Sequence, residues 1–173
     1  MTALGVVIFP EADTTQVEQF RADWDPLADA VAAHITIVFP LDWPGSASDM
    51  GAVLAEVASD HASFAIELNQ PTIWDGEYLF LLADEGKDRI ARLHGDAYAH
   101  LRIAAPARFV PHMTVGRSAQ RERIVAALGE ADRVGLSLSA TVRSLSVYLI
   151  GAGDRGPALS VDLGNMREAG SPK

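Results

Sequence analysis

The sequence contains no cysteine among its 173 residues. Disulfide bonds, a thiolate nucleophile and cysteine-ligated zinc or iron–sulfur sites are therefore excluded. Long apolar runs are also missing: residues 4–9 are too few for a signal-peptide core, and no later run approaches the roughly 20 residues of a membrane span. We therefore expect a soluble, cytoplasmic protein without a membrane partner. A monomer is the expected state, although the sequence does not determine the oligomeric state.

Basic residues are scarce. The 14 Lys and Arg residues are outnumbered by 23 Asp and Glu residues, which gives a formal net charge of -9. Proteins that bind long nucleic acids usually carry a basic face, because an acidic surface repels the phosphate backbone. The charge balance favours a small nucleotide or a short RNA end as the partner, and it argues against DNA.

Metal-ligand patterns are lacking too. The sequence has no His-x-x-x-His pair and no acidic cluster at ligand spacing, so neither a metal site nor a cofactor is predicted. Structural or surface roles are expected for His61, His94 and His100, which lie within or near predicted helices.

The residue pattern indicates one globular α+β domain with antiparallel sheets, since 49% of the residues are hydrophobic and strands and helices are mixed along the chain. The predicted strands cover residues 4–9, 34–39, 64–68, 77–82, 108–117, 135–140, 142–150 and 158–163. The predicted helices cover residues 14–23, a stretch from the cap Ser48 to Val57, residues 90–101, and a stretch from the cap Ser118 to the stop signal Gly129.

One short pattern occurs twice, each time on a predicted strand: His34-Ile35-Thr36-Ile37 and His112-Met113-Thr114-Val115. Residues two apart in a strand share a face, so each histidine and its threonine point the same way. The apolar residues between them point to the opposite face and can anchor the strand in the core.

Two such histidines suit phosphodiester chemistry. One neutral imidazole can deprotonate the attacking oxygen while a protonated one delivers a proton to the leaving oxygen. Thr36 and Thr114 can donate hydrogen bonds to the phosphate oxygens, on which charge grows in the transition state. We therefore predict that His34 and His112 are catalytic and that the threonines bind phosphate.

Two segments resemble the signatures of the 2H phosphoesterase superfamily, which includes 2′-5′ RNA ligase-like proteins and cyclic phosphodiesterases: Ala33-His34-Ile35-Thr36-Ile37-Val38-Phe39-Pro40 and Phe109-Val110-Pro111-His112-Met113-Thr114-Val115-Gly116-Arg117. Asp25-Pro26-Leu27 ahead of the first segment fits as well. The resemblance implies a bilobal fold with two antiparallel sheets, flanking helices and a central cleft. The resemblance covers most of the chain, and we expect a single domain over residues 1–165 followed by a flexible tail over residues 166–173.

The resemblance also implies metal-independent hydrolysis of cyclic phosphodiesters, such as the 2′,3′-cyclic phosphates of nucleotides or RNA ends. The acidic composition favours hydrolysis of a small substrate over the joining of RNA ends. Two alternatives stay open, which are ATP-independent 2′-5′ RNA ligation and a non-catalytic module that binds RNA or a nucleotide. The physiological substrate and the assignment of acid and base between the histidines are not fixed by the sequence.

Arg117 is a further candidate for phosphate binding, because a guanidinium group can bind two oxygens at once. In a regular strand it would point away from Thr114, and only a bulge after Gly116 would turn it back. Four aromatic residues could stack on a base, although core packing is the default role of each. These residues are Phe9, Trp43, Trp74 and Tyr148.

Overall fold

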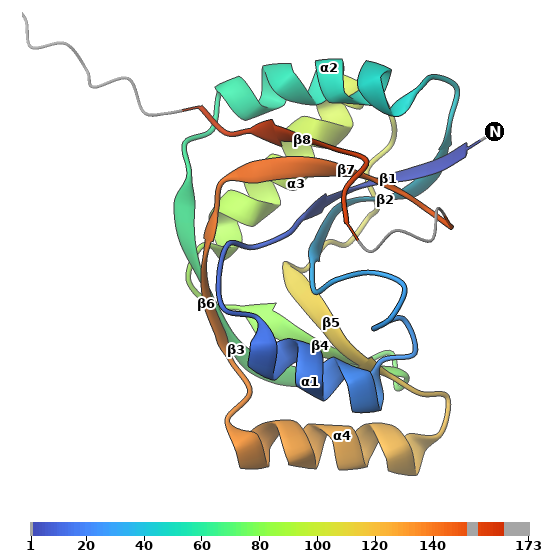
Figure 1. The fold of residues 1–173 in the computed structure, drawn as a ribbon, viewed down its shortest axis with the longest axis vertical. Helices are drawn as coiled ribbons and strands as arrows, with labels where there is room; N and C mark the ends of the chain where they lie inside the picture. The colour runs from blue at the N-terminus through green and yellow to red at the C-terminus, as the bar shows by residue number, and fades with distance from the viewer. Residues whose placement is uncertain (1, 152–155, 165–173) are drawn as a thin grey trace, which may run out of the picture.

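The computed structural model describes residues 2–151 and 156–164, so the predicted tail over residues 166–173 lies outside the described part. Twelve elements follow one another in the predicted order of strands and helices (Figure 1). They are β1 (Thr2–Ile8), α1 (Thr15–Trp24), β2 (Ile35–Trp43), α2 (Ala47–Ser59), β3 (Phe64–Trp74), β4 (Tyr78–Ala83), α3 (Lys87–Leu101), β5 (His112–Arg117), α4 (Arg121–Val134), β6 (Leu138–Val142), β7 (Ser144–Leu149) and β8 (Leu159–Asp162).

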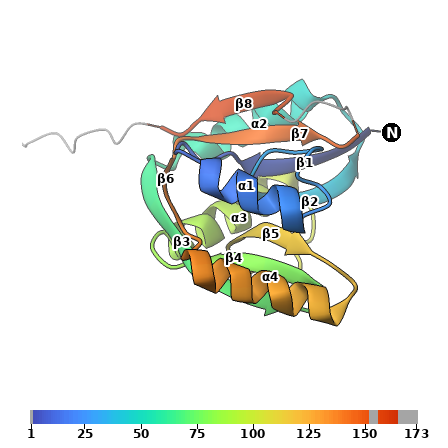
Figure 2. The ribbon, with the colours of Figure 1, turned by 60° about the horizontal axis from the view of Figure 1, so that its bottom comes forward.

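The eight strands form one curled antiparallel sheet with the order β6-β3-β4-β5-β2-β1-β7-β8. A single registered pair, Ile35 opposite Met113, connects β2 with β5, and we call it the junction pair. The two predicted sheets are the four-stranded halves on either side of it. Helices α2 and α3 pack against the half from β2 to β8, while α1 and α4 pack against the other half (Figures 1 and 2).

The core forms because the strands turn their apolar residues to one side. Ile35 and Ile37 in β2 and Met113 and Val115 in β5 are completely buried. The two predicted His-x-Thr pairs alternate with these residues; their four side chains are only half-buried and stand on the opposite face. The packing that anchors the two strands therefore also fixes the direction of the His-x-Thr side chains.

Strand β2 continues past Pro40 instead of ending at Phe39 as predicted. The register between β1 and β2 shifts between Leu4 and Val6, which leaves Pro40 in a bulge where the missing N–H is not needed. Gly5 faces this bulge, and a Cβ atom there would come within 3.8 Å of the proline ring. The proline thus bends the strand without ending it.

Two helix boundaries differ from the predicted ones. Helix α2 is capped by Ser46, not Ser48: the Ser46 hydroxyl accepts the backbone N–H of Asp49 at 3.2 Å, and the Asp49 carboxylate accepts the Ser46 N–H at 2.7 Å. Helix α4 continues through Gly129 and ends at Gly135, whose φ of 60° is left-handed. The cap residue types were predicted correctly, but their positions were not.

The predicted boundaries around the second His-x-Thr segment also shift. Strand β5 begins at His112 rather than at residue 108, because the chain reaches it through Pro111. Helix α4 begins after Gln120, and the Ser118 hydroxyl accepts the Gln120 N–H at 3.1 Å in the turn before the helix. Both candidate histidines therefore lie where a loop enters a strand, since His34 directly precedes β2.

Candidate active site

The two His-x-Thr segments meet where the halves of the sheet join. Continuing the antiparallel register of the junction pair by one residue each way places Thr36 opposite His112 and His34 opposite Thr114. The two segments are registered at the junction pair alone. One hollow lies between the halves of the sheet beside this pair, and a second lies on the half from β2 to β8, between its strands and the loop before β2.

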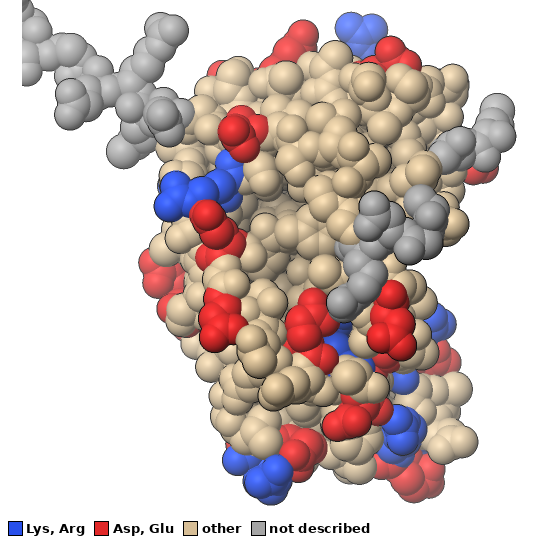
Figure 3. All heavy atoms as spheres, viewed as in Figure 1, with Lys and Arg blue, Asp and Glu red and all other residues tan. Residues whose placement is uncertain are grey.

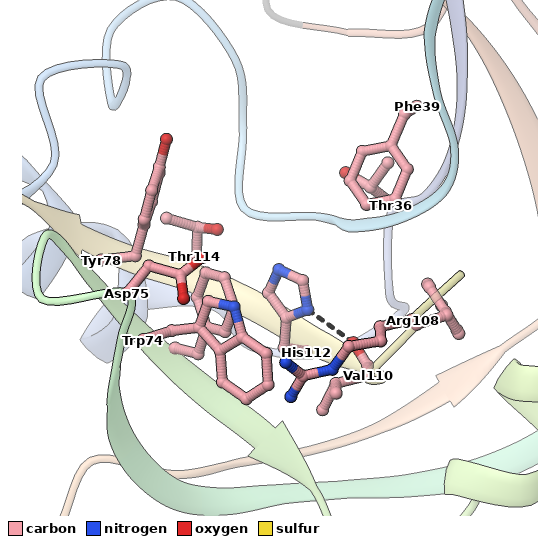
Figure 4. Close-up of a pocket in the computed structure, with 11 residues that line it drawn as sticks. Thr36, Phe39, Trp74, Asp75, Tyr78, Arg108, Val110, His112 and Thr114 are labelled. Atoms are coloured by element: carbon pink, nitrogen blue, oxygen red, sulfur yellow. Dashed lines mark hydrogen bonds between the residues drawn. The ribbon is translucent and has the colours of Figure 1, made fainter. Parts of the chain in front are cut away.

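The first hollow has a volume of about 300 Å³ and is lined by His112, Thr114 and Thr36. In Figure 4, Thr36 and Phe39 stand on one side of it, across from His112 and Thr114 on the other. Most of the remaining wall is aromatic and comes from Phe39, Trp74, Tyr78, Phe80 and Phe109.

The second hollow has a volume of about 380 Å³ and is lined by His34, Thr36 and mostly apolar side chains. Because Thr36 belongs to the walls of both hollows, the two meet at this residue. The structure therefore brings all four predicted residues of the His-x-Thr pairs to one place.

Both imidazoles are held in the same way. His34 Nδ1 lies 2.8 Å from the Ala32 carbonyl oxygen, and His112 Nδ1 lies 2.6 Å from the Val110 carbonyl oxygen. A carbonyl oxygen can only accept a hydrogen bond, so Nδ1 carries the hydrogen in both rings. In the neutral form, Nε2 is then the nitrogen of each ring that can accept or deliver a proton during a reaction.

Aromatic rings support both histidines. The Phe80 ring stacks on His112 with centroids 3.6 Å apart, and the Phe9 ring is tilted against His34 at 6.1 Å. Trp74 stacks in turn on Phe80 at 5.7 Å. These contacts fix the planes of the imidazoles and exclude water from one side of each.

Burial lowers the pKa of both histidines below the ordinary value of 6.5. The hydrogen bonds to Ala32 and Val110 raise the pKa of each ring in part, and the nearby His34 ring lowers the pKa of His112 further. Both rings are thus neutral at pH 7 in the free protein. An anionic phosphate between them would raise both values and supply the protonated form that an acid catalyst needs.

Two guanidinium groups lie on aromatic rings of the first hollow. Arg108 stands over Trp74 at 5.1 Å, and Arg117 stands over Tyr78 at 5.0 Å. Asp75 is the acidic residue in the described lining. Acidic side chains are spread over the face of the molecule drawn in Figure 3, whereas Arg108 and Arg117 place local positive charge next to the cleft.

The direction of Arg117 follows from a bulge in β5. Between the pairs made by Gly116 and Thr114, β5 has one more residue than β4, and the extra residue is Val115. The bulge reverses the alternation, so Arg117 stands opposite Tyr78 on the face of the first hollow. A bulge thus turns Arg117 to the face of Thr114, as the sequence analysis required, but it lies before Gly116 rather than after it.

Comparisons with known proteins identify the family of the chain. The sequence model of the 2′-5′ RNA ligase superfamily matches residues 9–154 of the chain. The chain belongs to this superfamily. The predicted membership of the 2H phosphoesterases and the predicted α+β fold are thus confirmed, whereas no curated protein sequence matches the chain.

Solved structures share the superfamily fold over nearly all of the chain. A phosphoesterase has a TM-score of 0.61 at 17% identity, with 95% of this chain and 100% of that chain covered. E. coli LigT complexed with 3′-AMP has a TM-score of 0.59 at 17% identity, with 95% and 99% covered. E. coli LigT complexed with NADP+ has a TM-score of 0.60 at 16% identity, with 95% and 98% covered.

In this member of the superfamily, a buried arginine holds the loop before His34 in place through ion pairs and a hydrogen bond. Arg21 on α1 is 1% exposed, and its guanidinium group lies 2.9 Å from the Asp25 carboxylate and 3.2 Å from that of Glu18. It also donates to the Val31 carbonyl oxygen at 3.0 Å. We call this set of ion pairs the Glu18–Arg21–Asp25 network.

The network fixes the backbone at both ends of the loop. The second oxygen of Glu18 accepts the Ala33 N–H at 2.6 Å, and the second oxygen of Asp25 accepts the Leu27 N–H at 3.0 Å. Since Ala33 directly precedes His34, the network fixes the backbone position from which the His34 side chain extends. Its carboxylates raise the pKa of His34 and Arg21 lowers it, both less than burial does.

The other three histidines have structural contacts. His94 is buried, bonds the Ile37 carbonyl oxygen at 2.8 Å and stacks on Phe109 at 3.7 Å. His61 is buried with its Nε2 2.8 Å from Asp96. His100 is exposed and bonds a backbone carbonyl on its own helix. These contacts fit the structural and surface roles expected for the three residues.

No group of three or more His, Asp or Glu residues in residues 2–151 and 156–164 is placed to hold a metal ion. No helix in this part of the chain is long and apolar enough to cross a membrane.

Sequence reasoning missed several residues of the site. Trp74 and Tyr148 were named as possible stacking residues, with core packing as the default role, and they line the first and second hollows. Tyr78 and Phe80 were not singled out, although their spacing of two puts them on one face of a strand. Arg21 falls four residues after Val17 on an apolar stripe, and a charge there could have signalled a buried ion pair.

Proposed function

We propose that the chain hydrolyses 2′,3′-cyclic phosphodiesters of nucleotides or short RNA ends without a metal ion, with His34 and His112 as acid and base. The observation that carries this proposal is the meeting of two His-x-Thr segments at the junction pair, each with Nδ1 held by a carbonyl oxygen. Two imidazoles on either side of one phosphorus atom can remove and deliver the two protons of the reaction.

The reaction needs one proton transfer at each end. Water attacks phosphorus and loses a proton to one Nε2, a new P–O bond forms, and the P–O bond to one ribose oxygen breaks. That oxygen takes a proton from the other imidazole, which leaves a nucleoside monophosphate. Thr36 and Thr114 donate hydrogen bonds to the phosphate oxygens, where negative charge grows in the transition state.

The first hollow suits the nucleoside. Its flat aromatic walls and its two guanidinium groups match a base and an anionic phosphate. The LigT structures complexed with 3′-AMP and NADP+ support a nucleotide-sized ligand. Arg117 is proposed to contact the phosphate, because the bulge in β5 puts it on this face.

The proposal predicts turnover of 2′,3′-cyclic AMP or UMP in excess EDTA, with unchanged rate when the chelator is omitted. Chromatography of the products identifies the monophosphate, and incubation with RNA halves that end in a cyclic phosphate tests joining without ATP. A rate that is lost in EDTA and restored by zinc or manganese would contradict the metal-free mechanism. A 2′-5′ joined product without hydrolysis would make ligation the function, and tight binding with no turnover would indicate a binding module.

A matched pair of variants controls this assay. Arg117→Met should raise KM by about tenfold, because removing a charge-assisted hydrogen bond costs about 1.4 kcal/mol or more. Arg92→Met removes the same charge from an exposed position on α3 and should leave KM unchanged. Equal KM values for the two variants would exclude the proposed contact of Arg117 with phosphate.

A further inference from the structure

The second hollow shares Thr36 with the first but differs from it in chemistry. His34 and Thr36 stand at the end where the hollows meet, and the volume of about 380 Å³ exceeds the 300 Å³ of the first hollow. Apolar side chains supply much of its wall, namely Val7, Leu27, Val31, Val38, Pro40 and Ile150.

Polar partners are few in the part of this hollow's wall that the structure describes. Its described lining contains no Asp, Glu, Lys or Arg, whereas the first hollow contains Asp75 and Arg108. The Tyr148 hydroxyl already donates to the Ala30 carbonyl oxygen at 3.0 Å. A charged or strongly polar group would lose its water here without gaining equivalent hydrogen bonds, so the hollow selects against such groups.

Exposed hydrophobic residues gather at the same cleft. Leu27 and Ile150 in the second hollow are 51% and 43% exposed, and Phe39 in the first is 42% exposed. The remaining large exposed hydrophobic residue of the described chain is Val125 on α4, which lines neither hollow. Exposed apolar side chains that concentrate at a cleft mark a place where a ligand covers them.

We propose that the second hollow binds an uncharged, apolar alcohol group that is esterified to the substrate phosphate. The proposal rests on the proposed function, because it places the phosphate at Thr36 between the two imidazoles and the nucleoside in the first hollow. The substrate class is then a nucleoside 3′-phosphodiester whose second alcohol is apolar. His34 and Thr36 line this hollow as well as the proposed phosphate site. A group bound in the hollow is therefore part of the substrate and not a separate ligand.

The chemistry of this substrate follows from the same two groups. The ribose 2′-oxygen attacks phosphorus and gives its proton to His112 Nε2, while the P–O bond to the apolar alcohol breaks. The departing oxygen takes a proton from His34 Nε2, and the products are the free alcohol and a 2′,3′-cyclic phosphate. Water then opens the cyclic phosphate in the hydrolysis described above, with each imidazole acting in the reverse direction.

Binding of three non-reactive diesters tests the second hollow apart from catalysis. The ligands are 2′-deoxynucleoside 3′-phosphates esterified with methanol, n-butanol or 1,3-propanediol, which lack the attacking 2′-hydroxyl. Burial of each methylene strengthens binding about fourfold, so calorimetry should give a Kd for the butyl ester about 10 to 60 times lower than for the methyl ester. The 3-hydroxypropyl ester has nearly the size of the butyl ester but should bind no better than the methyl ester.

Variants assign the preference to this hollow. Leu27→Gln and Ile150→Gln, each at an exposed position, should reduce the ratio of the methyl-ester Kd to the butyl-ester Kd severalfold, and Val125→Gln should leave this ratio unchanged. Equal Kd values for the three esters, or a ratio that Leu27→Gln and Ile150→Gln do not alter, would overturn the proposal.

Parallel assays separate this proposal from the proposed function. Turnover of 2′,3′-cyclic nucleotides with no alkyl preference in binding would refute the apolar alcohol alone. An alkyl preference in binding with no turnover of the corresponding ribonucleoside butyl ester or of the cyclic nucleotide would overturn both catalytic steps and leave only the binding of the alcohol.

Discussion

His34→Gln and His112→Gln should each lower kcat for a 2′,3′-cyclic nucleotide by about 10² to 10⁴, the usual contribution of a general acid or base. Glutamine has a polar side chain of similar reach but cannot exchange a proton near neutral pH. The double variant should be little worse than either single variant, because the two groups act in one concerted step. Steady-state kinetics of the three variants measures both effects.

Two controls accompany these variants. His100→Gln changes an exposed histidine on α3 and should retain wild-type kcat. Circular dichroism should show the same fold for all of the proteins, since neither His34 nor His112 belongs to the buried core. If one of the two single variants keeps full activity, the paired mechanism is wrong.

Arg21→Met should lower the free energy of unfolding by ~3 to 5 kcal/mol, because it leaves the buried carboxylate of Asp25 without its cation. In the folded variant, kcat should fall by a larger factor than KM rises, because the Glu18–Arg21–Asp25 network holds the backbone that leads into His34. Urea unfolding gives the first quantity, and kinetics at 10–20 °C gives the second.

The matched control for Arg21→Met is Arg133→Met. Arg133 pairs with Glu130 at 2.6 Å on the surface of α4, where solvent screens the charges and the pair contributes little. The urea midpoint and kcat of this variant should remain those of the wild type. Similar losses in the two variants would mean that burial of the Glu18–Arg21–Asp25 network is unimportant.

The order of elements was predictable because strands and helices here obey their own periodicities. The His-x-Thr pairs could be placed on one face because residues two apart in a strand share a side. Their meeting at the junction pair could be inferred only from the family resemblance, since no local pattern determines which of eight strands become neighbours.

The positions of Pro40, Arg117 and Arg21 could not be predicted from the sequence, because they depend on tertiary contacts. Pro40 lies inside β2 because a bulge opposite Gly5 accommodates it, and Arg117 faces the first hollow because Val115 bulges. Both effects depend on the partner strand, which periodicity does not reveal. The partners of Arg21 likewise come from a loop whose path only the folded chain shows.

The most direct test of the central claim is the titration of the histidines by NMR, with and without inorganic phosphate. In the free protein, burial should hold the pKa values of His34 and His112 below 6.5, so both rings become neutral as the pH rises through a value lower than usual. Bound phosphate should raise both pKa values together, because its charge favours the protonated rings. A phosphate effect on one of the two rings only, or on neither, would contradict their convergence on a single phosphate.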